Sequence, residues 1–520
     1  MKRSISLLLS LLLLVGLVAP AAAADALLPY EGETVTYTGY AADLGIKEDR
    51  SSLITSEYFK GMGNVSIEWS TAPWADYDQK TAQFLNTGDL PDIVWLRKAP
   101  SVIANYGTMG YFLNFMDYID YMPNLKAYLE EYPHLSSIKT EDGALYALQA
   151  VEPNDYVDES FFVNTTELKK LGKELPTTWE EMLDCMRAYK AANPDGVPFI
   201  TYGWGMDYYL YCLGAINNAK TGFYFDGEKW THALLNESSG YKDLVSMLHT
   251  MYEEKLLHPE FSTMSDEQAN QIVQDGNWLF SFYYLNAITH EILMDQPATF
   301  EYEAMFAPAF KAGDPRYSVI TVPFDNNPGW GFFVNAKVKQ PELLCAYLDK
   351  VISKEASLLY NWGIEGTTFE TKDGQRGYLE GYKTSDERRA AGIGNFMDVR
   401  YICWKMRDVD YFGGSDMSRA SYDKIINGLL SGELVGIRTL RGTPSFTAEQ
   451  NETIGRSVTP MKTYISENVS TFIDGTRSME EWDAFVQETL ALGNMDEVLK
   501  TYEDAKQVIH STEPRYVKYN

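Results

Sequence analysis

The chain has 520 residues, of which 45% are hydrophobic and 22% are charged, so it is long enough to form two large domains or about three average ones. Its 73 acidic side chains outnumber its 44 basic ones and give a formal net charge of -29, which argues against binding to nucleic acid or anionic lipid surfaces. Aromatic residues make up 14% of the chain, a high share that asks for an explanation.

Residues 1–24 have the form of a secretory signal peptide. Lys2 and Arg3 provide a positive start, residues 5–18 are almost continuously apolar, and a run of alanines predicts cleavage near Ala24. The apolar run is short for a membrane span, and no other stretch approaches eighteen apolar residues. We therefore expect a secreted or extracytoplasmic protein, at the cell surface or in the periplasm, without a direct membrane span.

The segment after the signal peptide has the pattern of a βαβ unit. The stretch "ETVTYTGYAA" alternates as a strand, and Val65, Ile67 and Trp69 alternate in a second one. The stretch "DYDQKTAQFLN" predicts a helix that ends at Gly88, and the apolar run 93–96 predicts a fully buried strand. This order favours a parallel sheet.

The middle of the chain repeats this alternation. The stretches "VPFITYGWG", "NWLFSFYYLNAI" and "GWGFFVN" predict strands, and the last is followed by one helix from Pro341 to Gly363. Capping boxes at Thr178 and Ser478 predict two further helix starts.

These elements predict an α/β protein of two lobes between which the chain crosses more than once. Lobe 1 is expected to comprise residues 25–153 and roughly 300–345. Lobe 2 is expected to comprise residues 154–299 and roughly 346–520, with extra helices at the C-terminal end.

The cysteines form no C-x-x-C pair, so a zinc or redox motif is not indicated. Secretion permits disulfides, and four cysteines allow three pairings. Cys185 shares a helical face with Met182 and Met186, which makes a buried free thiol there at least as plausible as a bridge. The four are Cys185, Cys212, Cys345 and Cys403.

Sequence motifs of common catalytic centres do not occur. The chain has no P-loop, no H-E-x-x-H and no G-x-S-x-G pattern, and its acidic residues are so many that carboxylate pairs carry little diagnostic weight. We predict no catalytic residues, no cofactor and no metal.

Aromatic and polar residues follow several predicted strands, where ligands of open α/β sheets bind. An aromatic face can pack on the C–H face of a sugar ring while carboxylate, amide and guanidinium groups bond its hydroxyls. Each residue can also be an ordinary core or surface residue; Trp95 and Trp278, inside strands, are interpreted as core. The candidate ligand-binding residues are Trp74, Asp76, Arg97, Trp204, Asp207, Tyr283, Tyr284, Trp330 and Trp404.

Several longer stretches resemble the extracellular solute-binding proteins of ABC sugar transporters, in particular the large LipO-like branch of family 1. They are "TGDLPDIV", "DGALYAL", "VNTTELKKLGKELPTTWEEMLDCMRAYKAANPDG", "NWGIEGTTFE" and "FIDGTRSMEEWDAFVQETLALGNMDEVLKTYEDA". The resemblance implies a two-lobed, periplasmic-binding-protein-like (type II) fold with a ligand cleft between the lobes. It also implies a carbohydrate ligand, an ABC permease and a separate ATPase.

The chain departs from that pattern in two places. Relatives often begin with a lipoprotein signal that ends in cysteine, whereas no cysteine precedes Cys185, so we expect no N-terminal lipidation. Relatives also often carry a calcium loop, but the matching stretch "NPDGVPFI" keeps only Asn193, Asp195 and Gly196. We predict that no calcium binds there.

The sequence therefore predicts a monomeric, non-enzymatic binding protein that takes an oligosaccharide in an aromatic-lined cleft and delivers it to a permease by hinge closure. Two alternatives stay open: a secreted carbohydrate-active enzyme, and a peptide-binding or sensor binding protein.

Overall fold

The computed structural model describes residues 27–42, 56–97, 99–131, 139–140, 142–149, 157, 159–201, 205–285, 299–320, 330–372, 375–383, 385–393, 416–437 and 441–509. The predicted signal peptide lies outside these residues. The chain divides into two compact units. Unit 1 comprises Met1–Pro153, Asn327–Gly374 and Tyr378–Met406, and unit 2 comprises Asn154–Asn326, Gln375–Gly377 and Arg407–Asn520.

Unit 1 is built on a sheet whose described strands lie in the order β11-β3-β1-β2. β1 (Tyr30–Ala42) runs parallel to β2 (Gly63–Ala72) and to β3 (Ile93–Arg97), and β11 (Trp330–Val334) runs antiparallel to β3. The apolar residues of β3 are all buried, as expected for an interior strand. The predicted βαβ unit is confirmed.

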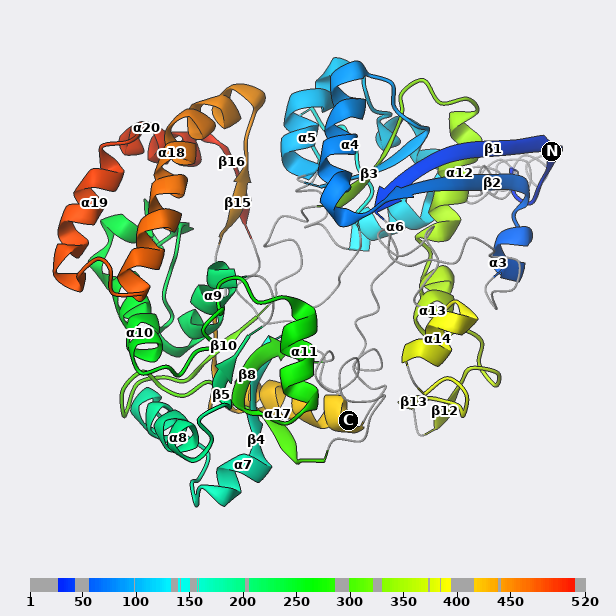
Figure 1. Ribbon diagram of the computed structural model, residues 1–520. Helices are drawn as coiled ribbons and strands as arrows, with labels where there is room; N and C mark the ends of the chain where they lie inside the picture. Colours follow the sequence, from blue (N-terminus) through cyan, green and yellow to red (C-terminus); the bar gives the residue numbers. More distant parts are fainter. Residues whose placement is uncertain are drawn as a thin grey trace, which may run out of the picture. The chain divides into compact units, whose positions relative to one another are not determined.

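The helix of this βαβ unit is α4 (Trp74–Thr87), which lies against β1 and β2 (Figure 1). It ends where predicted, because Gly88 adopts a left-handed φ of 70°. The loop before β3 is tied to β1 by Asp92, whose carboxylate accepts from the Thr38 N–H at 2.8 Å and from its hydroxyl at 2.9 Å. These bonds fix the position from which β3 enters the sheet.

In chain order, the other described helices of unit 1 are α3 (Ser56–Lys60), α5 (Ala99–Tyr106), η1 (Gly107–Met109), η2 (Phe115–Tyr121), α6 (Pro123–Glu131), α12 (Pro341–Val351), α13 (Lys354–Trp362) and α14 (Ser385–Ala391). A two-stranded sheet of β12 (Phe369–Lys372) and β13 (Gln375–Tyr378) follows α13 along the chain.

Unit 2 is built on a mixed sheet in the order β5-β8-β4-β9. β5 (Val197–Ile200) runs parallel to β8 (Trp278–Tyr284), and β4 (Glu159–Asn164) runs antiparallel to both β8 and β9 (Tyr302–Met305). Every residue of β4 is buried. Its side chains alternate between two hydrophobic clusters, with Phe161 in the larger one and Phe162 in the smaller one. Apolar layers therefore cover both faces of this sheet.

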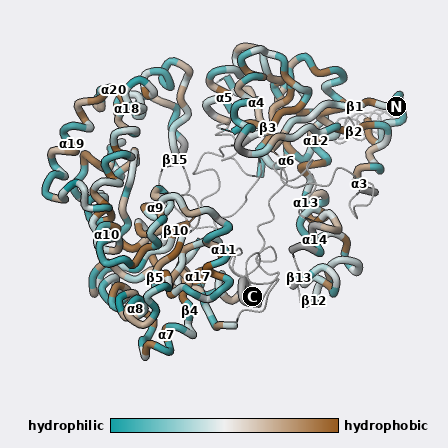
Figure 2. The backbone as a smooth tube through the Cα atoms, viewed as in Figure 1, coloured by the Kyte–Doolittle hydropathy of each residue, from teal (hydrophilic) through white to brown (hydrophobic). Residues whose placement is uncertain are grey.

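The larger cluster is formed mainly with α8 (Trp179–Ala192), α9 (Gly205–Asn217) and α10 (Tyr241–Glu253), and the smaller one with α11 (Asp266–Gln274) and α17 (Asp416–Ser431). Hydrophobic and hydrophilic residues are interspersed along these helices, as expected of amphipathic helices (Figure 2). The remaining described helices of unit 2 are α7 (Thr165–Lys170), η4 (Ala233–Leu235), η5 (Glu237–Ser239), α18 (Ala448–Ile473), η7 (Met479–Glu481), α19 (Trp482–Leu490) and α20 (Met495–Asp504).

Three short strand pairs complete unit 2. β6 (Phe223–Phe225) pairs with β7 (Trp230–His232), β10 (Tyr317–Val319) with β14 (Val435–Ile437), and β15 (Arg441–Ser445) with β16 (Lys506–Ile509). The C-terminal helices predicted from the sequence are present, and α20 packs on β7 through Trp230 and Tyr502, whose ring centroids are 5.2 Å apart.

The expected lobe boundaries differ from the two units in three stretches. Residues 300–326 fall in unit 2 rather than lobe 1, because β9 pairs with β4 and β10 with β14. Residues 378–406 fall in unit 1 rather than lobe 2. Residues 346–374 also fall in unit 1 rather than lobe 2. The reason is that Asp349 of α12 caps α6, accepting from the N–H groups of Asn124 at 3.1 Å and Leu125 at 2.9 Å.

The single helix expected from Pro341 to Gly363 is interrupted. α12 ends at Val351, and Ser353 starts α13 by accepting from the Ala356 N–H at 3.1 Å. Gly363 ends α13 with a φ of 82° and a ψ of -131°, a conformation open only to glycine. The capping box is confirmed at Thr178 but not at Ser478, which caps the 3₁₀ turn η7.

The three described cysteines are free and buried, so the free-thiol interpretation of Cys185 is confirmed. Cys403 lies outside the described residues. Within the part of the chain that the structure describes, no helix combines the length and apolar character needed to cross a membrane.

Candidate functional site

The carboxyl ends of β1, β2 and β3 meet at one edge of the unit 1 sheet, because the three strands are parallel. Arg97 is the last residue of β3 and is exposed, and its guanidinium lies 3.2 Å from the Asp78 carboxylate of α4. Trp330, the first residue of β11, is the register partner of Arg97. The fold thus brings together two predicted residues that are more than 230 positions apart in sequence.

The start of α4 lies at the same edge. Trp74 is its first residue, and Asp76 is exposed in its first turn. Next to this turn, Tyr40 of β1 is buried, and burial together with the Asp76 carboxylate raises the pKa of its phenol. Among the described side chains, the unit 1 edge therefore carries the Tyr40 ring, the Asp76 and Asp78 carboxylates and the Arg97 guanidinium.

Unit 2 has a corresponding edge at the carboxyl ends of β5 and β8. Tyr284, the last residue of β8, pairs with Glu159, the first residue of β4. α9 begins after β5, and its Tyr208 donates to the Glu159 carboxylate at 3.3 Å. Both side chains are buried. Burial, and to a smaller extent the charge of nearby Glu159, raises the pKa of the Tyr208 phenol well above its usual range.

Tyrosine rings extend this edge towards solvent. Tyr211 lies one helical turn after Tyr208, its ring stacks on that of Tyr208 at 6.0 Å, and its side chain is 39% exposed. Tyr283 and Tyr284 are half-buried and pack edge to face at 5.1 Å. Together these rings present apolar faces beside a buried carboxylate, which is the combination that a hydroxylated ring requires.

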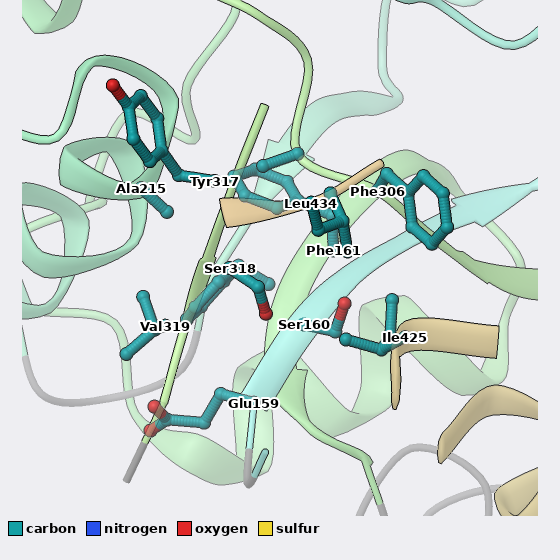
Figure 3. Close-up of a pocket in the computed structure, with 12 residues that line it drawn as sticks. Glu159, Ser160, Phe161, Ala215, Phe306, Tyr317, Ser318, Val319, Ile425 and Leu434 are labelled. Carbon is teal, nitrogen blue, oxygen red and sulfur yellow. The ribbon is translucent and has the colours of Figure 1, made fainter. Parts of the chain in front are cut away.

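A small cavity lies beneath this edge, between β4, α9 and β10 (Figure 3). Glu159, Ser160, Tyr317 and Ser318 are among its polar lining residues, and the Tyr317 hydroxyl points away from the other labelled side chains (Figure 3). Its volume of about 10 Å³ is room for about one water molecule. A sugar ring therefore does not fit inside it, and the edge above it is the better candidate for ligand contact.

The structure describes the predicted site residues to different extents. Asp76, Arg97 and Asp207 are exposed at the two edges, Tyr283 and Tyr284 are half-buried, and their roles stay predictions. The backbones of Trp74 and Trp330 are described but their side chains are not, and Trp204 and Trp404 lie outside the described residues. Trp95 and Trp278 are fully buried, which confirms their interpretation as core residues.

Sequence reasoning missed Tyr40, Glu159, Tyr208 and Tyr211. A usable signal existed for the tyrosines of α9, because residues three apart on a helix share a face and this helix follows a strand. Glu159 had no such signal, since its place beside Tyr208 depends on the register of β4 with β8.

The stretch matched to a calcium loop forms the turn between α8 and β5. Lys190 donates to the Gly196 carbonyl at 3.1 Å, and the Asn193 amide donates to Glu167 at 3.2 Å. A lysine ammonium beside that carbonyl opposes binding of a second cation. Among the described residues, no group of three or more His, Cys, Asp or Glu side chains is arranged to hold a metal ion.

Comparisons with known proteins place this fold. Among solved structures, the chain is similar to the alginate-binding protein AlgQ2 without calcium ion, with a TM-score of 0.74 and 19% identity over 91% of this chain and 98% of that one. It is also similar to the substrate-binding protein FusA of Streptococcus pneumoniae in complex with kestose, with a TM-score of 0.70 and 19% identity over 91% and 99%. These likenesses confirm the predicted type II periplasmic-binding fold class.

Two curated relatives match in sequence. The fructooligosaccharide ABC transporter substrate-binding protein FusA of Streptococcus pneumoniae is 31% identical over 32% of this chain. Lipoprotein LipO of Bacillus subtilis is 22% identical over 62% of it. The chain spans about a third and just under two thirds of the lengths of these relatives.

Residues 42–357 match the family model described as bacterial extracellular solute-binding protein, which is more than half of the chain. The resemblance stated from the sequence is thereby confirmed. The chain belongs to the family of bacterial extracellular solute-binding proteins.

Proposed function

We propose that the chain is the substrate-binding component of an ABC importer and that its ligand is an oligosaccharide, which it binds without changing any bond. The family supports solute binding, and the names of the similar proteins FusA and AlgQ2 refer to a fructooligosaccharide and to alginate. Those names describe the ligands of other proteins. The ligand class proposed for this chain rests on its own side chains.

The observation that carries the proposal is the tyrosine cluster around Glu159 in unit 2. Tyr211 offers an exposed ring face, Tyr284 lies opposite Glu159 in the sheet, and the buried Glu159 carboxylate is a strong hydrogen-bond acceptor. Each stacked ring adds about 0.5–1.5 kcal/mol beyond area burial. A few such contacts are enough for micromolar binding after ordering costs.

As the family resemblance implies, we expect the protein to close on its ligand by a hinge motion. Ligand binding then shifts an equilibrium between open and closed forms, and the closed form delivers the ligand to the permease, which a separate ATPase drives. The protein is expected to act outside the cytoplasm as a monomer that is cleaved near Ala24.

Isothermal titration calorimetry of the mature protein tests this proposal. The panel comprises kestose, maltotriose, a milk-type tetrasaccharide and an alginate trisaccharide, with a tripeptide as a ligand of another class. We expect binding of at least one sugar, recovered intact by chromatography. Binding of the tripeptide alone, or no heat with any member of the panel on folded protein, would contradict the proposal.

Two alanine variants locate the site. Tyr211→Ala removes an exposed ring at the unit 2 edge and is expected to weaken binding by about tenfold, since one stacked ring contributes about 1 kcal/mol. Tyr224→Ala is the matched control, because Tyr224 is half-buried on β6 and its hydroxyl accepts from the Asn236 amide at 2.8 Å. Equal affinities of the two variants would place the ligand elsewhere.

A further inference from the structure

Tyr40 occupies a fixed position at the unit 1 edge. Its side chain is 5% exposed, its ring stacks on Tyr77 with centroids 5.5 Å apart and an interplanar angle of 9°, and Phe84 meets it edge-on at 4.9 Å. Both contacts come from α4. The ring is therefore held by packing alone, and its hydroxyl group is not needed to position it.

The hydroxyl of Tyr40 is buried and has no hydrogen-bond partner among the described residues. A buried polar group without a partner destabilises a fold, because it has lost its hydrogen bonds to water and gained none in return. Such groups call for an explanation, and one explanation is a function that needs the group. Replacing the tyrosine with phenylalanine would remove this destabilisation while keeping the packed ring.

Tyr77, on which the Tyr40 ring stacks, directly follows Asp76 in α4, and the Asp76 carboxylate adds to the effect of burial in raising the pKa of the Tyr40 phenol. Asp76 lies in the first turn of α4, where the N-cap residue Pro73 supplies no side-chain cap. A phenol that donates and a carboxylate that accepts suit a group that can do both, and an alcohol hydroxyl is such a group.

We propose that Tyr40 and Asp76 form a subsite for a hydroxyl group of an uncharged sugar unit. The hydroxyl accepts from Tyr40 and donates to Asp76. This inference rests on the proposed function and adds to it the charge class of the ligand.

The charge of the neighbouring groups supports an uncharged ligand over an acidic one. Among the described residues of this edge, Arg97 forms an ion pair with Asp78, so its charge is shared with that carboxylate rather than given to Asp76 alone. A carboxylate-bearing sugar placed beside Asp76 would meet like-charge repulsion. We therefore expect no acidic sugar at this subsite, although the fold is similar to that of an alginate-binding protein.

The test compares Tyr40→Phe with a matched control on the same strand. Tyr37 is also buried, but its hydroxyl donates to the Gln340 carbonyl at 3.0 Å, so it has a structural role. We expect Tyr40→Phe to keep or raise the melting temperature without ligand and to weaken sugar binding by about tenfold. Tyr37→Phe should lower the melting temperature and leave the affinity unchanged.

Calorimetry with kestose, maltotriose and the milk-type tetrasaccharide measures the affinities, and an alginate trisaccharide is the acidic probe. Unchanged affinity of Tyr40→Phe for the sugar that wild type binds overturns the subsite and leaves the proposed function standing. Equal or tighter binding of the alginate trisaccharide overturns the charge class. If wild type binds none of these sugars, the proposed function fails and the subsite fails with it.

Asp76→Asn provides a second variant that does not depend on core packing, because this side chain is exposed. It is expected to weaken binding of the uncharged sugar and to reduce the preference for uncharged over acidic sugars. An unchanged preference would overturn the role of Asp76.

Discussion

The buried imidazole of His232 makes unit 2 sensitive to acid. The ring is 5% exposed, packs edge to face on Phe223 at 4.7 Å, and accepts a hydrogen bond at Nδ1 from the Leu234 N–H at 3.2 Å. That bond requires an unprotonated Nδ1. Burial lowers the pKa of His232 to about 4, from an ordinary value of 6.5.

The sign and size of the effect follow from this pKa difference. The folded state disfavours the protonated ring, so the stabilisation is complete above pH 6.5 and is lost as the pH falls towards 4. A pKa lowered from 6.5 to about 4 corresponds to a loss of about 2 kcal/mol in the free energy of unfolding between pH 7 and pH 4.5.

The variant His232→Asn isolates this contribution. An asparagine can keep the cap without titrating, as Asn236 does when it accepts from the Ser238 N–H at 3.0 Å. The variant also loses ring packing, so the comparison uses the change in stability with pH rather than its absolute value. Urea denaturation of both proteins at pH 7 and 4.5, followed by tryptophan fluorescence, measures that change. If the variant loses as much stability as wild type, the account of His232 is refuted.

Three further predictions concern stability and ions. Burial raises the pKa of Asp349 to about 6, so this carboxyl group takes up a proton in the folded state at a pH where the unfolded chain keeps it ionised. Wild type should therefore gain stability from this group as the pH falls from 7 to 5. The Asp349→Asn variant should not show this gain. Thr178→Ala should cost about 1 kcal/mol in urea denaturation because it removes a full capping box, and Ser478→Ala, at a 3₁₀ turn, should cost less. Calcium should leave the melting temperature unchanged, because Lys190 already bonds the Gly196 carbonyl.

Each of these has a defined contrary result. Equal pH dependence of wild type and Asp349→Asn would show that this carboxyl group does not titrate between pH 5 and 7. A larger loss from Ser478→Ala than from Thr178→Ala would contradict the capping assignment. A rise in melting temperature with calcium that Asp195→Asn abolishes would show a metal site in the turn after α8.

Local patterns predicted most of the elements because their causes are local. β3 could be recognised from its apolar run and α4 from its glycine stop, since burial on both faces and a left-handed C-terminal residue leave direct marks in sequence. The break between α12 and α13 was missed because a single serine within a helical pattern does not by itself end a helix. Whether Ser353 acts as a cap depends on the turn that it adopts.

The candidate site was harder to predict because its groups meet through long-range pairing. Arg97 and Trp330 become neighbours only when β11 pairs with β3. Glu159 comes within hydrogen-bond distance of Tyr208 only when α9 packs on the sheet that contains β4. Tyr40 could not be distinguished from an ordinary strand tyrosine, because what sets it apart is that its buried hydroxyl has no partner among the described residues. Periodicity carries no information on such pairings.

The central claim, that this chain carries an intact oligosaccharide, is tested most directly by native mass spectrometry of the protein purified from its own host. The account predicts an added mass equal to a whole number of uncharged sugar units, released unaltered on denaturation and lost from the Tyr211→Ala protein. A co-purified peptide or a cleaved sugar product would contradict it, and an intact acidic sugar would overturn only the charge class of the ligand.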